Sequence, residues 1–241
     1  MILYRITAKD SSRVLVTSED IRGFFVEHDS ETVEKFTLIR VHRAEMPRKK
    51  IEEAELHVLD RHGEPIGKYY LGRVLAAFQE LPHVGDDRHP DLDFSGYTWE
   101  YPKAGEIWKK WARGIEYGEW ARQPPEWHPS WLHVVQNAWF TAGKAATRYG
   151  TGSTAVLDGT KITSREAFFC ALGEAVNGTG GYFGSSHGGL LDCLRNAQQG
   201  GTPPFELIWR DFSVSRAALG DDFAHDVASA CRQHGVTVTQ M

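Results

Sequence analysis

The 241-residue chain has no long apolar run, few cysteines and no excess of basic residues. No stretch approaches the roughly 20 apolar residues that a membrane-spanning helix requires, so we expect no membrane association. The first ten residues become charged too early for a secretory signal, and we therefore expect a cytoplasmic protein. The net charge of −5 argues against direct nucleic-acid binding, which usually comes with a basic surface.

The three cysteines, Cys170, Cys193 and Cys231, are odd in number and show no CxxC spacing. This pattern predicts reduced, mostly buried thiols rather than a disulfide framework or a zinc site. The chain also contains no Gly-rich phosphate loop, nucleophile elbow or paired-acid motif. We therefore expect no catalysis, no cofactor and no small-molecule substrate.

A loop over residues 83–93 is rich in residue types that bind metals: His83, Asp86, Asp87, His89, Asp91 and Asp93. Their spacing fits no zinc site, EF-hand or two-histidine-one-carboxylate pattern. A hydrated loop without metal is the favoured interpretation. An enzyme built on residues 1–150 remains an alternative, and it would lose activity when His83, Asp87 or His89 is changed.

The first 82 residues alternate β-branched or aromatic residues with polar ones, which is typical of half-buried strands. Strands are predicted over residues 1–7, 13–17, 24–28, 36–41, 54–59 and 66–70. Residues 74–79 fit either a short helix or a continuation of the sheet. A mainly antiparallel sheet follows from this pattern.

Seven of the eight tryptophans lie between residues 99 and 139. Helices are predicted here over residues 105–119 and 130–149. The local charge is mixed, so a helical layer packed on the sheet, or an interaction surface, is favoured over stacking of nucleic-acid bases. Residues 1–150 are therefore predicted to form a β-rich α+β domain of unidentified kind.

A Gly/Ser/Thr stretch at residues 149–154 is typical of a linker, and strands alternate with helices after it. Strands are predicted over residues 154–157, 205–209 and 236–239, and helices over 164–176, 186–196 and 222–234. This alternation predicts an α/β domain at residues 153–241, with a three-stranded parallel sheet and packed helices.

The helix that begins near Ser186 has an identifiable inner side. His187, Leu190, Leu191 and Leu194 recur at helical spacing and are predicted to be buried. Gly188 and Asp192 are four residues apart on another face, with Arg195 nearby. Cys193 is predicted to pack behind this helix.

Two motifs in this region resemble the barstar family of ribonuclease inhibitors. Residues 182–194 read Tyr-Phe-Gly-Ser-Ser-His-Gly-Gly-Leu-Leu-Asp-Cys-Leu, similar to the family's Tyr-Tyr-Gly-x-Asn-Leu-Asp-x-Leu-Trp-Asp-Cys-Leu. Residues 205–212, Phe-Glu-Leu-Ile-Trp-Arg-Asp-Phe, resemble a family strand that ends in Trp-Arg-x-Phe. Gly235, between the last helix and the last strand, is a third match in the same order.

The resemblance implies a non-enzymatic inhibitor that blocks a secreted-type ribonuclease in immunity or self-protection. By this resemblance Asp192 would act as a phosphate mimic in the ribonuclease cleft. The partner-binding residues it implies are Tyr182, Gly184, Ser186, Gly188, Asp192 and Arg195. Phe183 and Trp209 are expected in the core.

The sequence departs from the family at three positions. Gly188 and Ala230 stand where the family has carboxylates, and Leu191 stands where a tryptophan is common. These differences favour a related ribonuclease over barnase as the target. The alternative is a non-inhibitory interaction module, in which the barstar-like fold has drifted and the Trp-rich zone binds another protein.

Overall fold

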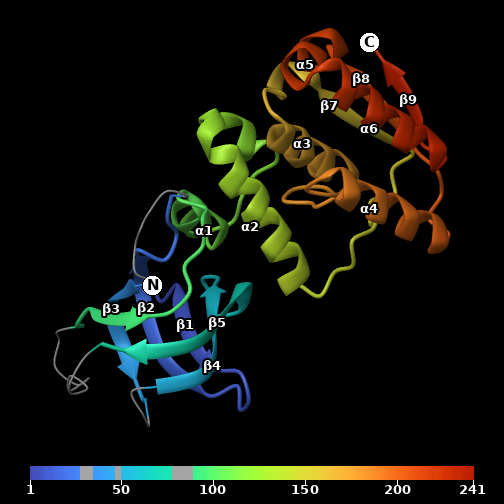
Figure 1. Ribbon diagram of the computed structural model, residues 1–241. Helices are drawn as coiled ribbons and strands as arrows, with labels where there is room; N and C mark the ends of the chain where they lie inside the picture. Colours follow the sequence, from blue (N-terminus) through green and yellow to red (C-terminus); the bar gives the residue numbers. More distant parts are fainter. Residues whose placement is uncertain (28–34, 47–49, 78–88) are drawn as a thin grey trace. The chain divides into compact units, whose positions relative to one another are not determined.

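Strands near the N-terminus close into a barrel in the computed structural model, which describes residues 1–27, 35–46, 50–77 and 89–241. The strands are β1 (Tyr4–Ala8), β2 (Val14–Arg22), β3 (Lys35–Ala44), β4 (Lys50–Leu59), β5 (Pro65–Ala76) and β6 (Leu92–Ser95). They are antiparallel in the order β1-β2-β3-β6-β5-β4, and β4 pairs with β1 to close the barrel (Figure 1). The predicted antiparallel sheet is therefore present, and its closure leaves no open edge.

The strand boundaries differ from the prediction at several places, among them β2, which continues to Arg22, and β4, which begins at Lys50. Phe25 forms only a single bridge, to Trp99, where a strand over residues 24–28 was predicted. Residues 74–76 continue β5, while residues 78 and 79 lie outside the described part of the chain. β6 was predicted as loop, but its Leu92 and Phe94 are buried and the strand pairs with both β3 and β5.

The first predicted helix is shorter than expected. Helix α1 (Ala104–Trp111) ends before Gly114 and Gly118, whose φ angles of 100° and 70° are incompatible with a continued helix. Its Trp108 is fully buried and donates a 2.8 Å hydrogen bond from the indole nitrogen to the Tyr69 hydroxyl of β5. This part of the Trp-rich zone therefore packs on the barrel.

Packing divides the chain into two units, Met1–Gly114 and Ile115–Met241. The division differs from the predicted domains 1–150 and 153–241, because residues 115–150 pack with the C-terminal unit. The linker-like residues 149–153 form an irregular segment within this unit, and β7 begins at Thr154. Composition alone does not distinguish an irregular segment inside a domain from a linker between two domains.

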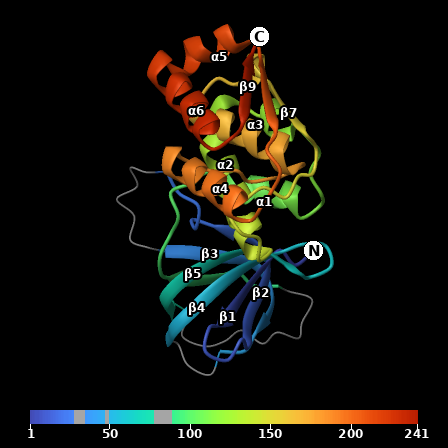
Figure 2. The ribbon, with the colours of Figure 1, turned by 90° about the vertical axis from the view of Figure 1, so that its right-hand side faces the viewer.

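The C-terminal unit contains the predicted three-stranded parallel sheet, in the order β7-β8-β9. Its strands are β7 (Thr154–Asp158), β8 (Glu206–Arg210) and β9 (Thr237–Gln240), and its α-helices are α2 (His128–Thr141), α3 (Arg165–Asn177), α4 (His187–Gln199), α5 (Phe212–Leu219) and α6 (Asp221–Gln233). Helix α3 lies against β7, α6 lies against β9, and α2 packs on α3 (Figures 1 and 2).

Two helices of this unit depart from the prediction. Helix α2 ends at Thr141 rather than at residue 149, because Gly143 has a φ angle of 71°. Helix α5 was not predicted at all. It buries only Ser215 and Leu219, which leaves too weak an apolar pattern to identify it from the sequence.

A buried carboxylate fixes the start of the C-terminal unit to α3. Glu174 is 4% exposed and accepts hydrogen bonds from the Gly118 amide at 2.8 Å, the Trp120 indole at 3.0 Å and the Gly180 amide at 3.2 Å. Burial raises the pKa of this carboxyl, while the three donors oppose that rise. Residues 118–120 are thereby attached to the middle of the unit.

Candidate functional site

The turn that leads into α4 depends on a glycine. Gly184 has a φ angle of 100°, and a Cβ atom there would come within 2.7 Å of the Leu190 amide nitrogen. No other residue fits this close approach without displacing the backbone. Ser186 then caps α4, because its hydroxyl accepts a 3.1 Å hydrogen bond from the Gly189 amide.

The inner side of α4 is formed by Leu190, Cys193, Leu194 and Ala197. The prediction was correct for Leu190, Leu194 and the packing of Cys193. It was wrong for His187, which is exposed at the first helical position, and Leu191 is only partly buried. Burial raises the pKa of the Cys193 thiol to about 12, so this cysteine stays protonated at neutral pH.

Four of the exposed residues of α4 and its N-cap are the predicted site residues Ser186, Gly188, Asp192 and Arg195, which we call the α4 face. Asp192 and Arg195 form an ion pair with an oxygen–nitrogen distance of 3.6 Å. Both side chains are more than half exposed, so this pair holds Asp192 only weakly and leaves it available to a partner. A Cβ atom at Gly188 would meet only the Ser186 hydroxyl, at 3.9 Å, so that position is open.

Two of the predicted site residues lie behind this face. Gly184 is buried and shapes the turn. Tyr182 is only 4% exposed, and the Phe140 ring of α2 packs edge-on against it at a centroid distance of 5.3 Å. Its hydroxyl lies 3.5 Å from the Ser185 hydroxyl. The structure therefore exposes the four residues of the α4 face. Tyr182 and Gly184 are buried in the turn that precedes α4.

Sequence reasoning missed Phe140, which is 45% exposed beside Tyr182. A signal for it was present: adjacent helical residues point in directions about 100° apart, and the neighbouring Trp139 is 4% exposed. Two consecutive large aromatic side chains near the end of a helix seldom share one buried side.

The exposure of the remaining residues singled out in this domain can be compared with the prediction. Phe183 and Trp209 are fully buried, as predicted, and all three cysteines are free and buried. Ala230, which matches an acidic family position, is 4% exposed on the inner side of α6. The α4 face therefore receives no carboxylate from that position.

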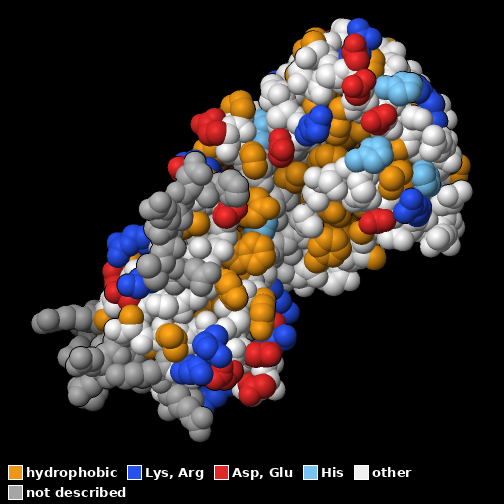
Figure 3. Space-filling view, in the orientation of Figure 1, with side chains coloured by type: hydrophobic (Ala, Val, Ile, Leu, Met, Phe, Trp, Pro, Cys, Tyr) orange, Lys and Arg blue, Asp and Glu red, His pale blue; other side chains and the backbone are white. Residues whose placement is uncertain are grey.

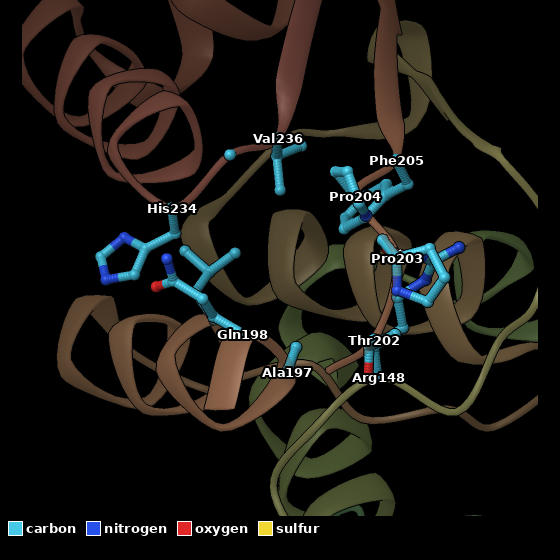
Figure 4. A pocket seen from close by; sticks show the side chains of 11 residues that line it. Arg148, Ala197, Gln198, Thr202, Pro203, Pro204, Phe205, His234 and Val236 are labelled. Atoms are coloured by element: carbon cyan, nitrogen blue, oxygen red, sulfur yellow. Dashed lines mark hydrogen bonds between the residues drawn. The ribbon is translucent and has the colours of Figure 1, made fainter. Parts of the chain in front are cut away.

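A cavity of about 190 Å³ lies beyond the C-terminal end of α4. Figure 4 shows His234 and Gln198 on one side of it and Pro203 and Pro204 on the other. The buried Arg148 guanidinium supports this region by donating to the carbonyl oxygens of Pro203, at 2.6 Å, and of Gly152.

The predicted loop around residues 83–93 is only partly described. His83, Asp86 and Asp87, which the metal-site and enzyme alternatives involve, lie outside the described residues. His89 stacks on His42 with a centroid distance of 3.9 Å. Asp91 accepts a hydrogen bond from the Arg40 amide and Asp93 accepts one from the Thr37 hydroxyl.

The described ranges contain neither a metal-binding cluster nor a membrane-spanning helix. Residues 1–27, 35–46, 50–77 and 89–241 contain no group of three or more histidine, cysteine or acidic side chains placed to bind a metal. Within the same ranges, no helix has the length and apolar character to cross a membrane.

The C-terminal part of the chain matches a known protein family. Residues 153–235, about a third of the chain, match the family model of Barstar (barnase inhibitor). This is a family of inhibitors that bind a ribonuclease, not of catalysts. No curated protein matches the chain.

Proposed function

We propose that this chain, whose residues 153–235 form a barstar-like domain, is a stoichiometric protein inhibitor of a small secreted ribonuclease. The observation that carries the proposal is the α4 face. It presents Asp192 as an exposed carboxylate, within the segment that matches the family. The protein would act in the cytoplasm, in immunity or self-protection.

The chemistry of inhibition follows from charge and shape. A ribonuclease cleft holds the phosphate groups of RNA with cationic side chains, and the Asp192 carboxylate offers those cations an alternative anion. The convex helix would also exclude RNA sterically. An ion pair that becomes desolvated in such a cleft can dominate binding, because loss of one partner leaves the other charge buried without compensation.

The departures from the family define the kind of target. With Gly188 in place of a carboxylate and Ala230 buried, the α4 face carries one acid and one base. Figure 3 likewise shows hydrophobic and oppositely charged side chains interspersed on the visible surface of the C-terminal unit. We therefore propose a ribonuclease with a less cationic cleft than barnase.

The test is titration of the full chain into barnase and a panel of related ribonucleases, with RNA cleavage as the readout. We expect activity to fall to zero at a one-to-one ratio for at least one member. Asp192→Ala should weaken that inhibition about 30-fold, equivalent to about 2 kcal/mol, without changing the thermal unfolding of the chain.

A matched control is Asp222→Ala at the start of α6, because it removes the same charge from another exposed helix of the unit. We expect its inhibition to stay within twofold of the unmodified chain. Equal losses in both variants would show that Asp192 acts only through net charge. If no ribonuclease is inhibited, the proposal fails and a non-inhibitory interaction module becomes the better account.

A further inference from the structure

The end of α2 presents an aromatic side chain beside Tyr182, in the turn that leads into α4. Phe140 occupies the last turn of α2 and is 45% exposed, whereas the adjoining Trp139 is 4% exposed. The Phe140 ring lies at an angle of 61° to the Tyr182 ring, with a centroid distance of 5.3 Å. Phe140 is therefore the exposed member of this aromatic pair, and Tyr182 is the buried one.

Helix α2 belongs to residues that precede the match to the family at residue 153. It covers Tyr182, an aromatic residue that the family resemblance assigns to the interface. The Phe140 ring packs edge-on against the Tyr182 ring, and Tyr182 is only 4% exposed. The outermost aromatic group at this edge is consequently supplied by α2.

The chain that follows α2 is held in place by side chains of α3 and α4. The Asn196 amide of α4 donates to the Ala146 carbonyl at 2.9 Å. The Asn177 amide at the end of α3 donates to the carbonyls of Thr147, at 3.0 Å, and of Tyr182, at 2.7 Å. These bonds fix α2 and its C-terminal segment against the same turn that carries Tyr182.

We propose that Phe140 replaces Tyr182 as the aromatic contact of the inhibitory surface, and that it seats on an apolar patch beside the catalytic cleft of the ribonuclease. This inference rests on the proposed function. A phenylalanine fixed by packing loses little side-chain entropy on binding, and aromatic residues are enriched at protein interfaces. Compared with the barstar family pattern, the proposed inhibitory surface lacks the carboxylate at Gly188 and has an additional exposed aromatic side chain at Phe140.

With Phe140 as a contact, the choice of ribonuclease partner would depend on α2, which precedes the barstar-like domain. A partner selected by Phe140 needs an apolar neighbour to its cationic cleft. A ribonuclease whose cleft is ringed only by charged residues lacks that neighbour and is expected to bind more weakly.

The experiment uses the full chain and a ribonuclease that it inhibits, with the dissociation constant measured from inhibition of RNA cleavage. Phe140→Ala should weaken binding at least tenfold. Tyr182→Phe should stay within twofold, because its hydroxyl lies near Ser185 inside the turn. Thermal unfolding of each variant verifies that the fold is retained.

Val214→Ala is the matched control, because Val214 is an apolar residue on α5 that is 51% exposed. Figures 1 and 2 place α5 away from α4 within the same unit. We expect a change of less than twofold.

The outcomes separate this inference from the proposed function. If Asp192→Ala weakens inhibition and Phe140→Ala does not, Phe140 is an ordinary exposed residue and the inference is overturned while the function stands. If the unmodified chain inhibits no ribonuclease, both proposals fall. A tenfold loss confined to Phe140→Ala and Asp192→Ala supports both.

Discussion

Helices α3 and α4 have the same length and opposite environments. Each contains 13 residues, but α3 buries nine of them and α4 buries four. Helix α3 packs between β7 and α2, whereas α4 contributes one narrow buried strip and leaves its outer side open. Because α3 is mostly buried and the outer side of α4 is open, we expect substitutions in α3 to affect folding. Substitutions on the outer side of α4 should affect binding.

The largest expected effect comes from a glycine-to-alanine substitution in each helix, which adds one methyl group. In α3, a Cβ atom at Gly173 would overlap the Gly181 carbonyl and approach the Phe183 amide nitrogen to 3.3 Å. Because backbone cannot move aside as a side chain can, we expect Gly173→Ala to lower the free energy of unfolding by about 3 kcal/mol. Urea denaturation of the full chain measures it.

The matched change in α4 is Gly188→Ala, where the new methyl group meets only the Ser186 hydroxyl at 3.9 Å. Alanine is the better helix former, so stability should rise by up to about 1 kcal/mol. Similar losses from the two substitutions would contradict the contrast between the helices.

A second test concerns the buried acid of α3. Glu174→Gln keeps the size of the side chain but turns one acceptor into a donor that faces an amide N–H. We expect a loss of about 2 kcal/mol in the free energy of unfolding, because a buried donor is left without an acceptor. Glu166→Gln, a partly exposed position in the first turn of the same helix, should cost a few tenths of a kcal/mol.

A third prediction extends the comparison to α2, which covers α3. Burial lowers the pKa of His133 from an ordinary value of 6.5 to about 4. Protonation therefore favours the unfolded chain, and stability should fall as the pH drops from about 6.5 to about 4. We expect His133 to account for about 1–2 kcal/mol of this loss.

The measurement is urea denaturation at several pH values for the unmodified chain and for His133→Gln, whose side chain does not titrate. Their difference in stability should change between pH 6.5 and pH 4 and stay constant above pH 7. A constant difference across the whole range would rule out this role for His133.

The smallest expected effect concerns the open position of the α4 face. Gly188→Asp would place a carboxylate one turn before Asp192, near the helix N-terminus, where negative charge is favourable. We expect affinity for barnase-type ribonucleases to rise about fivefold, close to 1 kcal/mol. Gly188→Asn provides the same shape without the charge and should leave affinity unchanged; an equal gain from Asn would assign the effect to helix formation.

Local sequence patterns predicted much of the C-terminal unit. The alternation of strands and helices predicted the parallel sheet, and the apolar spacing identified Leu190 and Leu194 as buried. These features depend on residues near one another in the chain. For that reason a local pattern was sufficient to find them.

The same reasoning failed where distant segments decide the outcome. Leu92 and Phe94 become a strand because β3 and β5 lie on either side, and closure of the barrel is not encoded in any one strand. The compact unit likewise begins earlier than the predicted domain at residue 153, because Glu174 attaches Gly118 and Trp120 to α3 from more than 50 residues away.

The sequence by itself determined the barstar-like motif, the exposed Asp192 opposite Leu190 and Leu194, and the absence of a carboxylate at Gly188. Only the tertiary structure decided that Tyr182 is covered and Phe140 is exposed. The physical reason is that a motif fixes which residues share one helix, whereas exposure depends on which other segment packs against it. Here that segment is α2, which lies outside the motif.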